Sequence, residues 1–296
     1  MANPNDFMKG VSSNADFSAF PPDITTDRPT IARSYGYLLG GKDNFEIDRA
    51  TSLKGLEVFP ESLDIARENR LFLYRAVRFL AEEAGIDQFL DLGSGLPAEN
   101  NVHQVAQATN PNARVVYVDI DPIVLAHGRA LLAENANTTI ITADITDPDS
   151  VIGHEETTRL IDFDRPVAVL LFSIPHCVPD DDAAERTIRA PMARAAPGSY
   201  LAISHVVSDD PAIAAAGTDT ATRLGVPWKT RTPGDVEPWL RDLEAIPPGL
   251  GDIGAWRPDP DQPPLAPVAE PLRRFVGAQD PTAKRAYEYG GVLRKP

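Results

Sequence analysis

The stretch Gln88-Phe-Leu-Asp-Leu-Gly-Ser-Gly-Leu-Pro97 decides the fold of this chain. It is a short apolar strand that ends in an acidic residue, followed by a glycine-rich turn and then a helix start near Asn100. This order is typical of a nucleotide-type cofactor site at the end of a first βα unit. The stretch therefore predicts a Rossmann-like domain.

The sequence after this turn alternates between apolar strands and helices. Strands are expected at Gln88–Leu92, Arg114–Asp119, Thr138–Ala143, Val167–Ser173 and Tyr200–Val206. The helices between them are expected at Val102–Ala108, Pro122–Glu134, Pro148–Leu160 and Asp181–Ala195. This alternation predicts an α/β fold with a doubly wound, mostly parallel sheet and right-handed crossovers.

The last part of the chain breaks this alternation. A helix is expected at Val236–Glu244, a strand near Gly251–Trp256, and a final strand within Ala286–Arg294. Two late strands after five parallel ones are typical of a hairpin that closes one edge of the sheet.

The residues before the first strand predict a helical extension. We expect residues 1–25 to be a flexible arm and residues 26–85 to be a helical cap or lid on a Rossmann-like domain at 86–296. Asp27 can cap a first helix, which Gly40-Gly41 ends. Further helices are expected within Phe45–Phe59 and from Glu61 to Ala84.

Composition excludes several classes of protein. The 296 residues carry 28 Lys and Arg against 43 Asp and Glu, a formal charge of −15. Such an acidic chain repels phosphate backbones and anionic membranes, so we expect neither nucleic acid nor membrane as a partner. The single cysteine, Cys177, rules out an internal disulfide and favours a cytoplasmic location. No membrane span is predicted, and the oligomeric state stays open.

Candidate cofactor contacts begin at the glycine turn. Gly93, Ser94 and Gly95 let the backbone pass close under a ligand, where a Cβ would collide. A dinucleotide site requires a third glycine, and this chain has Leu96-Pro97-Ala98 there. Asp91 at the strand end would repel a pyrophosphate but would suit a sulfonium cofactor with a free amino group. An ordinary tight turn is the alternative interpretation.

Acidic residues also end the next two strands. Asp119, followed by Ile120, can accept both hydroxyls of a ribose, and Asp121 is better explained as the cap of the next helix. Asp144 can meet the amine of an adenine, with Ile145 beside it. The alternative for Asp144 is a helix cap or turn.

Ser173-Ile-Pro-His-Cys-Val-Pro179 follows the fourth strand, at the sheet edge where ligands bind. Ser173 is a candidate cofactor contact there. His176 could act as a base, because histidine exchanges protons near neutral pH. The alternative is a buried histidine satisfied by backbone groups, and His205 has a weaker claim to a role.

A second glycine-rich segment, Gly36-Tyr-Leu-Leu-Gly-Gly-Lys42, has the spacing of a phosphate-binding loop. Asp43 stands where that loop needs a serine or threonine, and the segment ends a helix, so we reject this reading. We expect a lid over the cofactor, in which Tyr37 and Asp43 are further candidates for a base. No metal site is predicted, because the five histidines are scattered.

With these residues in view, the chain resembles the class I S-adenosylmethionine-dependent methyltransferases, and more narrowly an actinobacterial family of such proteins with no assigned substrate. The segments that carry the narrower resemblance are Arg28-Pro-Thr-Ile-Ala-Arg33, Tyr37-Leu-Leu-Gly-Gly-Lys-Asp-Asn44, Phe89–Pro97, Asn101-Val-His103, Val116–Pro122, Phe163-Asp-Arg-Pro166 and Gly291-Val-Leu-Arg-Lys-Pro296. They span nearly the whole chain after residue 25.

The resemblance implies a seven-stranded sheet with the last strand antiparallel and S-adenosylmethionine as cofactor. It implies that Asp91, Gly93 and Gly95 hold the methionine part, that Asp119 holds the ribose, and that Asp144 and Ile145 hold the adenine. We therefore expect methyl transfer to a small molecule of unknown identity. The alternatives are a regulatory protein that binds the cofactor without catalysis and, with less support, an NAD(P)-dependent reductase.

Overall fold

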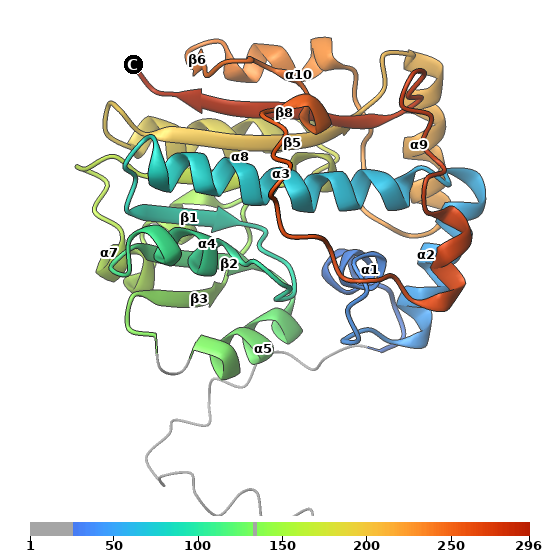
Figure 1. Ribbon diagram of the computed structural model, residues 1–296, viewed down its shortest axis with the longest axis horizontal. Coiled ribbons are helices and arrows are strands. Elements are labelled where there is room, and N and C mark those ends of the chain that lie inside the picture. Colours follow the sequence, from blue (N-terminus) through green and yellow to red (C-terminus); the bar gives the residue numbers. More distant parts are fainter. Residues whose placement is uncertain (1–25, 133–134) are drawn as a thin grey trace, which may run out of the picture.

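In the computed structural model, which describes residues 26–132 and 135–296, one sheet of eight strands forms the centre of the protein (Figure 1). The strands are β1 (Gln88–Leu92), β2 (Arg114–Asp119), β3 (Thr138–Thr142), β4 (Ala168–Leu171), β5 (Tyr200–Val207), β6 (Glu244–Ala245), β7 (Gly251–Asp252) and β8 (Tyr287–Arg294). Their order is β3-β2-β1-β4-β5-β8-β6, and β7 also pairs with β8.

Strands β1 to β5 are parallel, as predicted. The final strand β8 runs antiparallel to β5, which confirms the direction expected for it. The chain order reverses between β1 and β4, which are neighbours in the sheet. In doubly wound sheets ligands bind at this reversal, outside the carboxyl ends of the strands.

The α-helices are α1 (Ile31–Leu38), α2 (Glu46–Val58), α3 (Ser62–Glu82), α4 (Val102–Thr109), α5 (Pro122–Leu132), α6 (Pro148–Ile152), α7 (Glu155–Leu160), α8 (Asp181–Arg194), α9 (Pro211–Arg223) and α10 (Pro233–Leu240). Three short 3-10 helices follow the same numbering: η3 (Pro175–Cys177), η4 (Ile253–Ala255) and η5 (Glu270–Phe275). Helices α1 and α2 lie beyond the carboxyl ends of the parallel strands (Figure 1).

The sheet is buried on both faces. Successive residues of β1 show the alternation: Phe89 packs in one apolar cluster with Phe72 of α3, and Leu90 packs in another with Ile188 of α8. Both faces of the sheet are therefore covered by helices, which explains why every residue of β1 is buried and why β4 is apolar at every position.

The structure corrects several predicted boundaries. Thr30, not Asp27, caps α1, because its hydroxyl accepts the Arg33 N–H. The helix expected at 148–160 is two helices, divided at Gly153, and α9 was not predicted. The helix expected at 236–244 begins and ends earlier, as α10.

The late strands differ most from the prediction. The sheet has eight strands rather than seven, because β6 and β7 are separate two-residue strands. The strand expected at 251–256 ends after two residues and continues as η4. In addition β8 is not an edge strand, since β6 pairs along its far side. The predicted arm at 1–25 and the end of the helix predicted to reach Glu134 lie outside the described residues.

Gly290 lies where β8 passes closest to β5. A Cβ at this position would penetrate the backbone oxygen of Ile203, whereas a Cβ at its cross-strand partner Gly251 would meet nothing within 4 Å. We expect Gly290→Ala to lower the free energy of unfolding by about 2–3 kcal/mol, since overpacked positions rarely relax fully. Denaturant unfolding with Gly251→Ala as the control measures this, and equal stability of the two variants would contradict it.

Candidate functional site

The glycine turn after β1 forms the floor of the candidate site. Gly93 and Gly95 both have positive φ, +77° and +68°. A Cβ on Gly93 would overlap the side chain of Ile174 in the loop after β4, whereas a Cβ on Gly95 would enter open space. Gly93 therefore lets the two loops pack together, and Gly95 leaves room above the turn for a ligand.

Asp119 is fixed by this turn. Its Oδ2 accepts the Gly95 N–H at 2.8 Å and its Oδ1 accepts the Asp121 N–H at 2.9 Å. Burial raises the pKa of Asp119 to about 6, against those two hydrogen bonds. The next residue, Ile120, is 64% exposed, an apolar side chain presented at the ligand edge. Asp121 Oδ1 accepts the Ile123 N–H, which confirms the capping role predicted for Asp121.

Asp91 is a buried carboxyl that lacks a hydrogen-bond partner among the described residues. Burial is the main cause that raises its pKa to about 7; Arg70 opposes the shift and the charge of Asp119 adds to it. Ser94 adds a second buried polar atom without a protein partner, its Oγ. Two such groups beside an open turn are the expected surroundings of a polar ligand.

Arg70 was missed by the sequence analysis. It lies on α3, donates to Glu99 O at 2.6 Å and to Asn101 Oδ1 at 3.2 Å, and interacts electrostatically with Asp91. Burial lowers the pKa of Arg70. On a long helix with many charged residues, nothing in the pattern separates this arginine from its solvated neighbours.

Asp144 and Ile145 follow β3 beside the end of β2. Asp144 Oδ1 accepts from the N–H and the hydroxyl of Thr146, at 2.8 and 2.7 Å. This is the turn that was the alternative interpretation of Asp144, and it engages one carboxyl oxygen. The contact of Asp144 and Ile145 with an adenine stays a prediction.

Ser173 follows β4 in the left-handed region, with φ of +60°. Its N–H donates to Ser204 Oγ at 2.8 Å, and its hydroxyl donates to Glu288 Oε1 at 2.5 Å. Glu288, on β8, was not predicted as a site residue, because it lies 115 residues away in the chain. Ser173 is therefore hydrogen-bonded to both β5, through Ser204, and β8, through Glu288.

His176 does not have the surroundings of a base. It is buried, its Nδ1 accepts the Val206 N–H at 3.0 Å, and its ring lies 4.0 Å from that of Trp228. Burial holds its pKa well below the ordinary value, so the ring is neutral. This is the buried, backbone-satisfied histidine of the alternative interpretation. His205 is likewise buried, and burial lowers its pKa to about 3.

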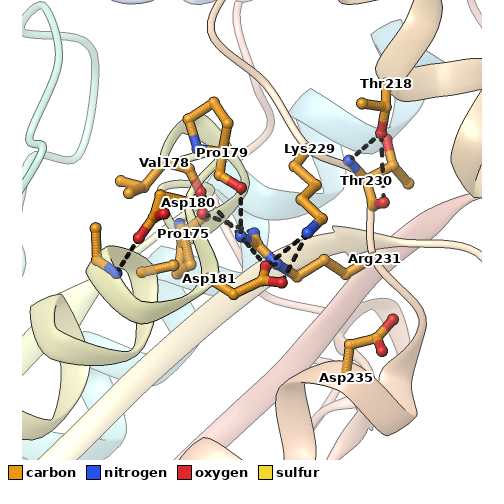
Figure 2. A network of polar contacts seen from close by, with 12 residues as sticks. Pro175, Val178, Pro179, Asp180, Asp181, Thr218, Lys229, Thr230, Arg231 and Asp235 are labelled. Carbon is orange, nitrogen blue, oxygen red and sulfur yellow. Dashed lines mark hydrogen bonds and ion pairs between the residues drawn. The ribbon is translucent and has the colours of Figure 1, made fainter.

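Arg231 fixes the loop after β4 (Figure 2). Its buried guanidinium contacts Asp181 Oδ1 at 2.8 Å and His205 Nε2 at 3.1 Å. It also donates to three carbonyl oxygens of the loop at 3.0–3.3 Å, those of Pro175, Val178 and Pro179. An arginine whose donors are satisfied in this way holds a loop in one conformation.

The two lid candidates occupy different surroundings. Tyr37 is buried in an apolar cluster with Leu56 of α2 and Leu272 of η5, and burial raises its pKa, so its hydroxyl is a poor base. Asp43 is half exposed and lies 3.7 Å from His127 Nε2 of α5. A role in catalysis stays a prediction for both. No group of three potential metal ligands, and no helix able to cross a membrane, is present in the described part of the chain.

The doubly wound sheet and the row of acidic residues at its carboxyl edge define a protein that binds a nucleoside cofactor with a positively charged end. The chain belongs to the S-adenosyl methyltransferase family, whose model matches residues 18–296. It is therefore an S-adenosylmethionine-dependent methyltransferase, and the reductase alternative is excluded. A comparison with curated proteins gave no match.

Two solved structures are similar over nearly the whole chain. A provisionally named methyltransferase from Thermobifida fusca YX is 43% identical, with a TM-score of 0.77, and the match covers 93% of this chain and 98% of that one. A DUF574 family protein from Streptomyces avermitilis MA-4680 is 34% identical, with a TM-score of 0.79 and coverage of 93% and 100%. Both confirm the fold.

Burial of the Asp91 carboxyl should lower the stability of the folded protein at neutral pH and above. Its pKa lies above the ordinary 3.8, so the folded state binds more protons than the unfolded state between pH 4 and 7, and stability falls as pH rises through that window. We expect Asp91→Asn to be more stable than the wild type at pH 8, with the difference shrinking toward pH 4.5. Thermal unfolding at both pH values measures this. Asp87→Asn, at a surface ion pair, should change little, and an Asp91→Asn variant less stable at pH 8 would contradict the prediction.

If His176 serves as a buried hydrogen-bond acceptor, its replacement should lower the free energy of unfolding. His176→Ala leaves the buried Val206 N–H without an acceptor and should cost about 1–3 kcal/mol. His176→Asn, whose Oδ1 can replace Nδ1, should recover part of that loss. Affinity for S-adenosylhomocysteine should stay within threefold in both variants that fold. A large loss of affinity with unchanged stability would restore His176 to the ligand site.

Proposed function

We propose that this methyltransferase acts on a small-molecule acceptor, with the cofactor lying across the carboxyl ends of β1 and β2. The observation that carries the cofactor placement is the buried Asp91 carboxyl, which has no hydrogen-bond partner among the described residues and lies near Arg70. An ammonium group and a carboxylate on one carbon would complement this pair. This complementarity also explains why an acidic residue, Asp91, occupies a position at the end of β1 where it would repel a pyrophosphate.

The other residues fit the remaining parts of the cofactor. Asp119 has two carboxyl oxygens at the glycine turn and would accept ribose hydroxyls, and the exposed Ile120 would cover one face of the adenine. Gly95 leaves the space that the ligand needs. When bound, S-adenosylmethionine supplies an electrophilic methyl group on a positively charged sulfur.

The contribution of the protein is mainly to position the acceptor against that methyl group. The loop after β4 is held rigid by Arg231, and the α1–α2 cap is joined internally by the buried Arg33–Asp48 pair, whose Nε and Oδ2 lie 2.9 Å apart. The cap lies over the end of the sheet that carries the site (Figure 1). An acidic edge favours a small acceptor over a nucleic acid, given the net charge of −15.

Methyl-labelled cofactor tests this proposal. After incubation with an actinobacterial cell extract, we expect label in the small-molecule filtrate rather than in protein or RNA. Asp119→Asn should lose at least tenfold of this transfer and at least tenfold of the affinity for S-adenosylhomocysteine, about 1.4 kcal/mol, because an amide nitrogen opposes the Gly95 N–H. Asp164→Asn, at an exposed ion pair, is the matched control and should retain both. Label found mainly in a macromolecule would overturn the small-molecule assignment.

A further inference from the structure

Ser173 and Glu288 form a hydroxyl–carboxyl pair at the ligand edge of the sheet. Glu288 is near the start of β8, opposite Val206 at the end of β5, because β8 runs antiparallel to the parallel strands. The hydroxyl of Ser173 donates to Glu288 Oε1 at 2.5 Å. The neighbouring Ile174 contacts the glycine turn at Gly93, so the pair lies beside the candidate cofactor site.

Glu288 is incompletely satisfied. It is fully buried, at 0% exposure, and its Oε2 has no hydrogen-bond partner among the described residues. A buried carboxyl oxygen without a partner costs free energy, and native proteins retain such groups mainly where function requires them. Ser173 is only half buried, so it lies between the buried carboxyl and the more open edge of the sheet.

A chain of hydrogen bonds orients this pair from behind. Ser204 Oγ accepts the Ser173 N–H at 2.8 Å and donates to Asn69 Oδ1 at 2.6 Å. Asn69 donates to the hydroxyl of Tyr35, which donates to a backbone carbonyl of α3. Ser204 also interacts with Glu288, and the hydroxyl of Ser173 donates directly to Glu288 Oε1. The chain also links the pair to helix α1 of the cap.

Burial favours the protonated form of Glu288. Burial is the main cause that raises the pKa of Glu288 to about 8, the charge of Glu68 adds to it, and the two serines oppose it. The other titratable groups that interact with Glu288 are Tyr35 and Cys177. Lys284 is engaged by Glu68 and Asp252, at 2.9 and 2.8 Å. A new positive charge would therefore be needed to expel the proton near neutral pH.

We propose that Ser173 binds a hydroxyl or amine of the acceptor and relays its proton to Glu288, and that Glu288 becomes ready for this by losing its own proton when the positively charged cofactor binds. The inference rests on the proposed function and specifies the acceptor. An acceptor with an O–H or N–H group and no negative charge fits a site that already carries Asp91, Asp119 and Glu288.

The proton and electron balance of this step is complete. The acceptor oxygen or nitrogen bonds to the methyl carbon while the carbon–sulfur bond breaks and leaves its electron pair on sulfur. The acceptor proton passes to Ser173 Oγ as the serine proton passes to the Glu288 carboxylate. The products are the methylated acceptor, S-adenosylhomocysteine and a neutral Glu288, whose proton leaves to solvent when the next cofactor binds.

Proton release on ligand binding tests the inference without a known acceptor. S-adenosylmethionine and S-adenosylhomocysteine share the amino-acid, ribose and adenine groups, so the effects of these shared groups on Asp91 and Asp119 cancel when the two are compared, and the Glu288→Gln variant identifies the part of the remaining difference that belongs to Glu288. Calorimetry at pH 7.5 in two buffers of different ionisation enthalpy counts the protons. The wild type should release roughly 0.5–0.7 proton more with S-adenosylmethionine. Glu288→Gln should abolish this difference, and Glu237→Gln, whose carboxyl accepts from Tyr289 of the same strand, should keep it.

The outcomes separate the two proposals. Equal proton release with both ligands in the wild type, or an unchanged difference in Glu288→Gln, overturns the role of Glu288. Failure of the wild type to bind either ligand instead overturns the proposed cofactor placement. If Glu288→Gln does not fold, the pH dependence of the wild-type difference decides, because it should vanish above pH 9, where Glu288 is already ionised. A difference that persists there overturns the inference.

A second variant tests the relay. Ser173→Ala should retain affinity for S-adenosylhomocysteine within threefold and should lower transfer of label to the extract filtrate at least tenfold. Ser150→Ala, at an exposed serine of α6, is the matched control and should retain transfer. Undiminished transfer by Ser173→Ala overturns the relay while leaving the small-molecule assignment intact.

Discussion

The burial of acidic side chains at one edge of the sheet is the constraint on which the site depends. Parallel strands end together, so Asp91 of β1 and Asp119 of β2 are brought to the same edge, and the antiparallel β8 adds Glu288. Each loses hydration there, and burial is the largest cause of the raised pKa of each. The edge is electrostatically incomplete without a positive charge. A sulfonium cofactor with an ammonium group supplies the charge that a dinucleotide lacks.

Two buried arginines hold the segments around this edge of the sheet in fixed positions. In the cap, Arg33 pairs with Asp48, which also accepts the backbone N–H groups of Thr30 and Phe45 and so joins α1 to the start of α2. In the loop after β4, Arg231 donates hydrogen bonds to three backbone carbonyl oxygens. Arg33, part of the Arg28–Arg33 signature segment, is therefore explained by the architecture of the α1–α2 cap.

The parts of the fold that periodicity determines were predictable, and the parts that depend on distant partners were not. The first five strands and the glycine turn follow from apolar runs bounded by turn residues, which are local signals. Helix α9 was missed because its alanine- and threonine-rich sequence has only two buried residues, Ala214 and Thr220, and so lacks a regular apolar face. In the candidate site, Asp91 and Asp119 were found because each ends a strand. Arg70 and Glu288 were missed because only the folded chain reveals their partners.

The contrast between His176 and Glu288 shows why residue type alone is a poor guide to a base. Histidine attracts attention because its ordinary pKa is near neutral, but burial disfavours its charged form and lowers that pKa. The same burial disfavours the charged form of a carboxyl and raises its pKa toward neutral, as at Glu288. In a buried region, a glutamate rather than a histidine is therefore the side chain that can exchange a proton near neutral pH. The histidines become neutral members of the core that accept fixed hydrogen bonds, and the glutamate becomes the group whose proton can move at physiological pH.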